Sequence, residues 1–325
     1  FACAKPGLLF DPGKRYAGEV LIRDIGIGFD AGEEETPWYG SVEKEDLDRF
    51  LTRTPMGNKG TFGKVLVLAG SGAMCGAAVL CARAVLASGA GMVKVVTEER
   101  NRTPLFCALP EAMADFWKED EPLPEEALLQ DLAWADAVVA GPGLSKSRTA
   151  KELLVFTVQH TEVPLVLDAD ALNLIAEDAE ILSGCRAEKI LTPHVGELAR
   201  LLHMTIAECQ RDPAGSAGRA AEKYQACCVR KDSVTVTAEE GREQYYINTS
   251  GSSALATAGS GDVLAGITGA FAAKRQCEKN EKKISLAKTA ALAAYAHGKA
   301  GEAAEEKSSA SYVTASEIIR GLQSI

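Results

Sequence analysis

The sequence has no apolar run near the roughly 20 residues that a membrane-spanning helix needs. It also lacks an excess of positive charge, since 35 Lys and Arg stand against 45 Asp and Glu, for a formal net charge of −10. This balance disfavours a surface for nucleic acid or for an acidic membrane. The first residues lack the charged segment and apolar core of a signal peptide, so we expect a cytoplasmic protein.

Cysteine and histidine do not occur in patterns that suit a metal centre. The nine cysteines lack zinc-type spacing, and the adjacent pair Cys227 and Cys228 lies in an apolar run where both side chains are expected to pack. An odd cysteine count without a disulfide framework is typical of the reducing cytosol. Four histidines leave little scope for zinc, and no Walker A sequence is present.

The first 40 residues differ in pattern from the remainder of the chain. The sequence begins with Phe1 rather than Met, so we expect a fragment or a processed product. A strand is expected within residues 18–27, followed by an acidic, glycine-containing connector over residues 31–37. The sequence therefore predicts an N-terminal extension over residues 1–40 and a main domain over residues 41–325.

From residue 64 onward, short apolar runs alternate with helix-compatible segments. Continuous apolar runs of this length are typical of strands in a parallel sheet that is covered on both faces. We expect such strands at residues 64–70, 92–96, 137–140, 164–167 and 189–192, and a hairpin formed by residues 233–238 and 243–248. With a helix expected over residues 76–88 and a helical C-terminal third, the pattern predicts an α/β fold around a mainly parallel sheet.

Polar residues follow several of these predicted strands. One strand ends in Gly141-Pro142-Gly143, and another leads into Asp168-Ala169-Asp170. In open α/β sheets, ligands bind at the carboxyl ends of the strands. The two aspartates can hold a hydrated magnesium ion or cap the following helix, and we favour capping for at least one of them.

Two further candidates remain open at this stage. His194 and Glu197 lie three residues apart at a strand-to-helix junction, where they share one face of a helical turn. The pair suits a metal site or a helix cap equally well. Lys231 follows an apolar run, and it can either reach a nucleotide phosphate or lie at the surface of a turn.

The most informative segment is Gly259-Ser260-Gly261-Asp262, a small-residue turn that opens an apolar, helix-compatible run. Glycine lets the backbone bend sharply and approach a ligand closely. The first amides of the following helix have no intrahelical acceptor and lie at the positive end of its dipole, so the turn predicts a phosphate site. Asp262 would repel that phosphate, and the turn alone leaves a general base and a helix cap equally open.

Five motifs in this order resemble the ribokinase-like superfamily and, within it, the ATP- or ADP-dependent NAD(P)H-hydrate dehydratases. Residues 259–262 match the Gly-x-Gly-Asp signature, and residues 192–197 are similar to the Thr-Pro-Asn-x-x-Glu motif with His in place of Asn. The other three motifs are Lys59-Gly60-x-x-Gly63, Gly141-Pro142-Gly143-Leu144 and the segment 167–173. The resemblance covers residues 45–325.

The resemblance implies a ribokinase-like three-layer α/β/α fold and a repair reaction. In this family, the S-epimer of hydrated NADH or NADPH is phosphorylated on the ring hydroxyl by ADP or ATP, and loss of phosphate restores the reduced cofactor. It further implies Mg²⁺ as cofactor and a homo-oligomer, often a tetramer. Residues 1–28 resemble the tail of an NAD(P)H-hydrate epimerase domain, so we expect that the chain comes from a bifunctional protein.

The resemblance also assigns roles to individual residues. Asp262 is expected to be the general base, with an unperturbed pKa near 4, while the glycine-rich turn stabilises the transferring phosphoryl group. Contacts to the hydrated cofactor are expected from Ala77, Gly143, His194 and Asp262. Nucleotide contacts are expected from Lys231, Asp232, Ser233, Val234, Thr235, Gly259, Ser260 and Gly261. Glu197 corresponds to the residue associated with magnesium through water.

Ser145 stands where the family commonly has glycine after the Gly-Pro-Gly-Leu motif, and two other departures from the family pattern lie on the nucleotide side. Asp232 follows Lys231 where the family has glycine, which adds negative charge near the expected phosphates. Residues 250–255 replace the usual Gly-Asn-Pro-Gly-Met stretch. The choice between ADP and ATP therefore stays open. Two rival functions also remain: a ribokinase-like kinase for a small alcohol such as a vitamin precursor, and a non-catalytic nucleotide sensor.

Overall fold

A ten-stranded sheet runs through the molecule. The computed structural model describes residues 5–23, 25–26, 38–278 and 283–325. The strands are β1 (Trp38–Gly40), β2 (Lys64–Leu68), β3 (Met92–Glu98), β4 (Met113–Trp117), β5 (Ala137–Ala140), β6 (Leu165–Leu167), β7 (Lys189–Leu191), β8 (Cys227–Arg230), β9 (Thr235–Glu239) and β10 (Gln244–Asn248).

The strand order is β1-β10-β9-β8-β7-β6-β5-β2-β3-β4. Strand β9 is antiparallel to both β8 and β10, and the other neighbouring pairs are parallel. A mainly parallel α/β sheet is therefore confirmed. Because β5, β6, β7 and β8 are neighbours and point the same way, the segments that follow them meet along one edge of the sheet.

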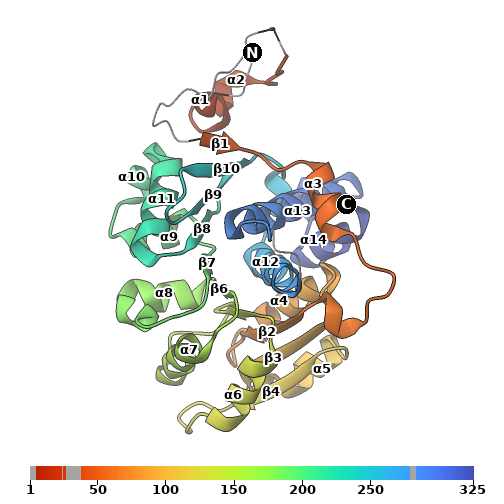
Figure 1. Cartoon of the computed structure of the whole chain (residues 1–325), viewed down its shortest axis with the longest axis vertical. Coiled ribbons are helices and arrows are strands. Elements are labelled where there is room, and N and C mark those ends of the chain that lie inside the picture. The colour runs from red at the N-terminus through yellow and green to blue at the C-terminus, as the bar shows by residue number, and fades with distance from the viewer. Residues whose placement is uncertain (1–4, 24, 27–37, 279–282) are drawn as a thin grey trace.

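Helices cover both faces of this sheet (Figure 1). One face carries α3 (Lys44–Leu51), α4 (Cys75–Ala87), α5 (Arg102–Ala108), α12 (Ser260–Cys277), α13 (Leu286–Glu306) and α14 (Ala315–Gly321). The other face carries α6 (Glu125–Trp134), α7 (Arg148–His160), α8 (Asp170–Glu177), α9 (Val195–Leu202), α10 (Ile206–Arg211) and α11 (Pro213–Tyr224). Within the described ranges, no helix combines the length and apolarity needed to cross a lipid bilayer.

Strand β2 explains why the apolar runs in the sequence are continuous. Val65 and Val67 pack into the core beneath α4, α12 and α13, whereas Leu66 and Leu68 pack into the core beneath α6, α7 and α8. All four side chains are completely buried. A strand that is covered on both faces needs apolar residues at every position rather than at every second one.

The outcome for the predicted elements is mixed. The five expected strands, the hairpin and the helix over residues 76–88 are confirmed. The sequence pattern did not identify β1, β4 or β8 as strands. Charged residues interrupt the apolar runs of two of them, since β4, an edge strand, contains Asp115 and β8 ends in Arg230. The expected strand over residues 18–27 is wrong for its described part, since residues 18–23 and 25–26 form no strand. Asp24, Ile27 and the connector 31–37 lie outside the described residues.

Helices α4 and α12 approach each other closely at a glycine. A Cβ added to Gly266 would stand 2.3 Å from the carbonyl oxygen of Cys81 and 2.8 Å from the Cβ of Ala84. Both distances are shorter than any stable contact, so only glycine lets the two backbones meet here. This contact fixes the position of α12, whose first turn holds the Gly259–Asp262 motif.

Replacing Gly266 by alanine is therefore expected to lower the free energy of unfolding by about 1–3 kcal/mol, because the added methyl group forces α12 away from α4. Urea unfolding measures this change. The matched control is Gly76→Ala in α4, where an added Cβ meets no atom within 4 Å. That exposed substitution should leave the stability unchanged or raise it by up to about 1 kcal/mol, because alanine favours a helix over glycine. Equal losses in the two variants would contradict the packing argument.

Candidate active site

Four neighbouring strands deliver polar groups to one edge of the sheet. The turn Gly141–Gly143 follows β5, Asp168 follows β6, His194 follows β7, and Lys231 follows β8. The backbone also joins the last two segments, since the amide of Lys231 donates to the carbonyl of Pro193 at 2.8 Å. The expectation that these residues gather at the carboxyl ends of the strands is confirmed by this geometry.

The Gly259–Asp262 turn packs against this edge as the start of α12. Gly259 has φ = 86°, a left-handed conformation, and an added Cβ would stand 2.5 Å from Cδ1 of Leu80 in α4. In the described part of the chain, the amides of Gly261 and Asp262 have no acceptor. Two unpaired donors at the positive end of an 18-residue helix are an arrangement that favours binding of an anion.

Asp262 is partly buried in the first turn of α12, and its side chain does not cap that helix. Burial raises the pKa of Asp262 to about 7, with the charges of Asp168 and Asp170 adding to the shift and Lys231 opposing it. The expected pKa near 4 is therefore wrong. The reason is tertiary, because the sequence does not reveal that two other aspartates face this carboxyl group.

Asp168 is the centre of the polar network at this edge. Its Oδ1 accepts hydrogen bonds from Thr192 Oγ1 and from Lys231 Nζ, both at 2.7 Å. Asp168 is 1% exposed. Burial disfavours the charge of Lys231, but the carboxylates of Asp168 and Glu197 outweigh it and raise the pKa of Lys231 above its ordinary value. Lys231 is therefore a fixed cation inside the site, and the surface-lysine alternative is wrong.

The expectation that Asp168 or Asp170 caps the next helix is also wrong. The N-cap of α8 is Ala169, with φ = 48° and no side-chain capping bond. Asp170 instead accepts a hydrogen bond from the amide of Ser145 at 2.8 Å. Asp170 thereby holds the segment that follows β5 against the segment that follows β6.

His194 and Glu197 form a capping box at the start of α9. The Nδ1 atom of His194 accepts from the amide of Gly196 at 2.9 Å, and Glu197 Oε2 accepts from the amide of His194 at 2.8 Å. Burial, together with the charge of Lys231, lowers the pKa of His194 below its ordinary value. The imidazole is thus neutral, with its remaining proton on Nε2. Burial raises the pKa of Glu197, against the opposing charge of Lys231.

A cleft of about 690 Å³ opens beside this network. We call it the main cleft; it is lined by Lys14, His194, Lys231, Asp232, Ser233, Thr235, Asn248, residues 250–253, residues 255–257, Ser260, Gly261, Leu264, Ala294, His297 and Gly298. Six of the eight residues expected to contact nucleotide therefore line one cavity. The two others are Val234, which is 2% exposed in the core, and Gly259, which lies against α4.

The residues expected to contact the hydrated cofactor are not all in the main cleft. Only His194 lines it. Gly143 has φ = 58°, and its added Cβ would stand 2.8 Å from the Cβ of Ala77, so these two residues form a separate contact between the β5 turn and α4. Ala77 lies one helical turn before Leu80, which touches Gly259. Gly259 is also close to Asp262, since its added Cβ would stand 3.8 Å from Oδ2 of Asp262.

Asp232, the first departure from the family pattern, is neutralised within the chain. Its Oδ2 accepts from Arg230 Nη2 at 3.0 Å, and its Oδ1 accepts from the amide of Ser233 at 2.8 Å. Arg230 is 1% exposed, and its Nε has no hydrogen-bond partner among the described residues. A buried guanidinium needs a carboxylate, and Asp232 supplies it. The negative charge expected near the phosphates is thus already paired.

Residues 250–255, the second departure, form an ordered wall of the main cleft. Ser253–Leu255 make a 3-10 turn that is capped by Ser252. The amide of Gly251 donates to Glu302 Oε1 at 2.7 Å, and the hydroxyl of Ser252 donates to Glu305, both acceptors lying on α13. This segment is therefore built into the structure, although it lacks the family's usual residues.

Lys14 and His297 are among the residues of the main cleft that the sequence pattern missed. His297 Nε2 lies 3.1 Å from the hydroxyl of Ser260, and burial lowers the pKa of His297 to about 4, so the ring is neutral. A histidine within the alanine-rich helical face was the sequence feature that could have identified His297. No sequence feature identifies Lys14, because its place beside Ser233 depends on how the N-terminal extension packs.

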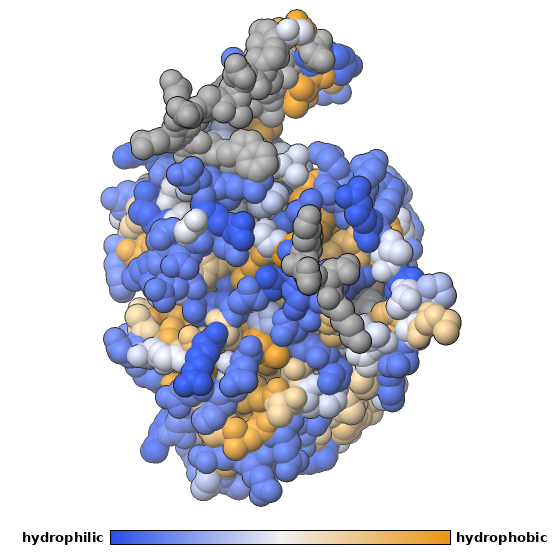
Figure 2. Space-filling view, viewed as in Figure 1, coloured by the Kyte–Doolittle hydropathy of each residue, from blue (hydrophilic) through white to orange (hydrophobic). Residues whose placement is uncertain are grey.

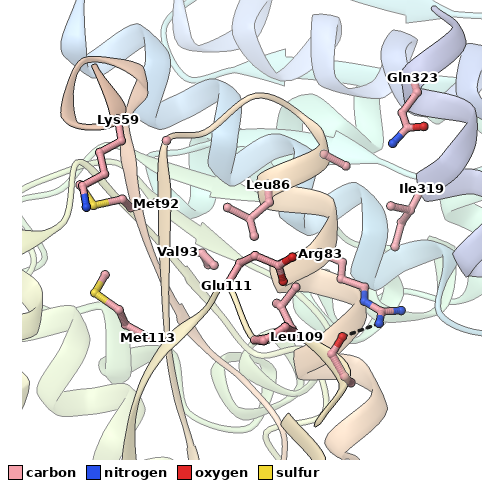
Figure 3. Close-up of a pocket in the computed structure, with 14 residues that line it drawn as sticks. Lys59, Arg83, Leu86, Met92, Val93, Leu109, Glu111, Met113, Ile319 and Gln323 are labelled. Atoms are coloured by element: carbon pink, nitrogen blue, oxygen red, sulfur yellow. Dashed lines mark hydrogen bonds between the residues drawn. The ribbon is translucent and has the colours of Figure 1, made fainter. Parts of the chain in front are cut away.

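A second pocket, of about 750 Å³, lies at the amino ends of β3 and β4 (Figure 3). Arg83 of α4 lines it and donates a hydrogen bond to the carbonyl of Ala108. Lys59, from the Lys-Gly-x-x-Gly motif, also lines this pocket. Because β3 is parallel to the central strands, the Lys59 motif lies at the opposite edge of the sheet from Asp168 and Asp262.

The Arg230–Asp232 pair yields a test of the first departure. Asp232→Gly restores the family residue but leaves the buried Arg230 guanidinium unpaired, so we expect a loss of about 2–4 kcal/mol in unfolding free energy. The double variant Arg230→Leu/Asp232→Gly should recover most of that loss. Urea unfolding of both single variants and the double variant completes the cycle. If the loss of unfolding free energy in the double variant equalled the sum of the losses in the two single variants, the stability contributions of Arg230 and Asp232 would be independent.

The raised pKa of Asp262 predicts a pH-dependent gain in stability for Asp262→Asn. The unfolded carboxyl ionises near pH 4, so the folded chain holds this proton more tightly between about pH 4 and 7. The contribution of Asp262 to stability is complete below pH 4 and is lost as the pH rises to about 7. The variant should therefore gain on the order of 1–3 kcal/mol over the parent chain by pH 8.

Urea unfolding at pH 4.5, 6 and 8 measures this gain. Glu126→Gln, at an exposed position on α6, controls for the removal of one negative charge. A stability difference between Asp262→Asn and the parent chain that stays constant across this range would contradict the raised pKa.

Comparison with known proteins agrees with this geometry. Residues 65–324 match the family model described as NAD(P)H-hydrate dehydratase. The bifunctional NAD(P)H-hydrate repair enzyme of Moorella thermoacetica is 35% identical over 321 residues, covering 94% of this chain and 57% of that protein. The ADP-dependent (S)-NAD(P)H-hydrate dehydratase of Neisseria meningitidis serogroup B is 36% identical over 263 residues, covering 79% of this chain and 82% of that protein.

Solved structures have the same fold. The ADP/ATP-dependent NAD(P)H-hydrate dehydratase of Bacillus subtilis, co-crystallised with ATP and Mg²⁺, matches with a TM-score of 0.72 and 29% identity, covering 89% of this chain and 97% of its own. A ribokinase-like superfamily protein from Enterococcus faecalis V583 matches with a TM-score of 0.74 and 28% identity, covering 88% of this chain and 94% of its own. The expected ribokinase-like fold is confirmed, and with four fifths of its length matched by the family model this chain belongs to the NAD(P)H-hydrate dehydratase family.

Proposed function

We propose that this chain dehydrates the S-epimer of hydrated NADH and NADPH, with ADP or ATP as co-substrate. The ring hydroxyl is phosphorylated; phosphate then leaves with its C–O bonding electrons, and a proton leaves from the adjacent ring carbon, which restores the double bond of the reduced nicotinamide. One observation carries the proposal: Asp262, an aspartate with a pKa of about 7, adjoins two unpaired amides and the fixed cation Lys231. The names of the relatives in Neisseria and Bacillus support the reaction and the choice of nucleotides.

Asp262 serves as the general base in this scheme. It accepts the proton of the ring hydroxyl while the hydroxyl oxygen attacks the terminal phosphorus of the nucleotide. The bond from that phosphorus to the bridging oxygen breaks, and AMP leaves from ADP or ADP leaves from ATP. A base is most effective when its pKa lies near the working pH, and a pKa of about 7 meets that condition. In this proposal the hydrated cofactor contacts Ala77, Gly143 and His194, and Asp262 lies between it and the nucleotide.

The start of α12 and Lys231 hold the transferring phosphoryl group. The amides of Gly261 and Asp262 point at the charge that develops on its oxygens, and they need no reorganisation during the reaction. Lys231 keeps its full charge because Asp168 fixes it in place. The nucleotide occupies the main cleft, against residues 231–235 and Ser260.

Magnesium fits this site through the nucleotide rather than through a protein cage. In the ranges that the structure describes, no group of three or more His, Cys, Asp or Glu side chains is arranged to hold a metal ion. Mg²⁺ commonly binds phosphates and waters with one or two carboxylates. Glu197 would hold such a water through Oε1, which lies 3.4 Å from His194 Nε2, since Oε2 accepts the amide of His194. When bound, the ion would neutralise charge on the phosphates.

The proposal also covers an additional domain, the oligomeric state and the cellular compartment. Because the chain spans 57% and 59% of the bifunctional relatives in Moorella and Escherichia coli, we infer an epimerase domain joined to the extension 1–40. In this proposal the dehydratase domain comprises residues 41–325. The active protein is a homo-oligomer, specifically a tetramer. The described cysteines are all free, which suits the reducing cytoplasm.

The deciding experiment supplies hydrated NADH, Mg²⁺ and either ADP or ATP, and follows the near-ultraviolet absorbance of NADH. Recovery of the absorbance with release of inorganic phosphate is expected. A stable phosphate ester without NADH would instead establish a kinase for a small alcohol. Nucleotide binding without either product would establish a sensor. No recovery with either nucleotide rejects the proposed dehydration.

Asp262→Asn should lower kcat by roughly 10²–10⁴-fold, because the amide cannot accept the hydroxyl proton. Nucleotide binding, measured by calorimetry, should be retained. In the parent chain, kcat should rise with pH through about 7 as Asp262 ionises. Glu126→Gln on α6 is the control, since it removes a negative charge at an exposed position. Near-normal turnover in Asp262→Asn would exclude Asp262 as the base.

A further inference from the structure

We propose that Lys14, in the N-terminal extension, binds the phosphates of the nucleotide in the main cleft. The inference rests on the proposed function for the identity of the ligand, and it adds a residue from outside the dehydratase domain to the site. It starts from one contact: Lys14 Nζ donates to the carbonyl of Ser233 at 3.0 Å. Ser233 lies two residues after Lys231, in the loop between β8 and β9.

Lys14 lines the main cleft together with Lys231, Ser233 and Thr235. An ammonium group has three donors, and the Ser233 carbonyl takes one of them. The other two remain available at the rim of the cavity. A bound ADP or ATP carries several negative charges on its phosphates, and a cation at this rim would lie beside the loop that is expected to contact them.

The charges around the main cleft set Lys14 apart from Lys231. Lys231 is held by Asp168 at 2.7 Å, and Asp232 is held by Arg230 at 3.0 Å. Within the described residues, Lys14 has no carboxylate at ion-pair distance. Its charge is therefore not neutralised by the chain itself, and a polyanionic ligand in the cleft is its natural partner.

The extension is fixed on the domain at a second point. Phe10 follows α1 (Pro6–Leu9) and packs against the apolar cluster formed by α9, α10, α11 and β8. Lys14 begins α2 (Lys14–Ala17). Figure 2 shows this part of the chain projecting from one end of a largely hydrophilic molecule. The Phe10 contact holds α2 beside the cleft without contributing charge to it.

Lys14→Ala is the primary test. Because the contact is exposed, we expect KM for ADP and ATP to rise roughly two- to fivefold, with kcat and the KM for hydrated NADH unchanged. Salt should weaken nucleotide binding more in the parent chain than in the variant. Lys14→Arg should restore most of the affinity. The matched control is Arg15→Ala, which removes an equal charge from α2 where the side chain is paired with Asp11.

Calorimetry separates this inference from the proposed reaction. ADP, ATP and uncharged adenosine are titrated into the full chain: Lys14→Ala should weaken the first two and leave adenosine unchanged. Phe10→Ala should weaken ADP binding to the same degree, and the double variant no further, because both act through the position of α2. An unchanged ADP affinity in Lys14→Ala, or an equal loss for adenosine or in Arg15→Ala, would overturn the inference even if dehydration is observed.

Discussion

The buried ion pair between Asp168 and Lys231 organises the active site. It joins the end of β6 to the end of β8, and Thr192, after β7, donates to the same carboxylate oxygen. Three strand ends are thus tied at one buried carboxylate. Breaking either side of such a pair leaves an uncompensated charge in a site of low dielectric, which is strongly unfavourable. The pair therefore holds the ammonium group of Lys231 in a fixed position and shields it from solvent.

The same pair also acts on the pKa of Asp262. Burial of the first turn of α12 raises this pKa most, the negative charge of Asp168 adds to the rise, and Lys231 opposes it. An aspartate with an ordinary pKa would be ionised but only weakly basic at neutral pH, whereas one near 7 is matched to proton transfer. The amides of Gly261 and Asp262, which have no acceptor among the described residues, lie beside this carboxyl group, as the proposed phosphoryl transfer requires.

The two departures from the family pattern look different once they are placed in the fold. Asp232 adds no free charge to the cleft, because it neutralises Arg230, whose side chain is buried. The segment 250–255 keeps its place through Glu302 and Glu305 of α13. Neither change affects the start of α12, where we propose that the phosphates bind. The nucleotide side therefore differs from the family in its residues but keeps the same supporting structure.

The sequence by itself determined the layered fold, the five central strands and the Gly259–Asp262 turn, because buried parallel strands and a glycine-rich helix start leave local patterns. Only the tertiary structure decided the pKa of Asp262, the fixed charge of Lys231 and the capping role of His194 with Glu197. It also decided the place of Lys14 at the main cleft. Each of these depends on charges and donors brought together from distant segments, and a local pattern carries no information about such distances.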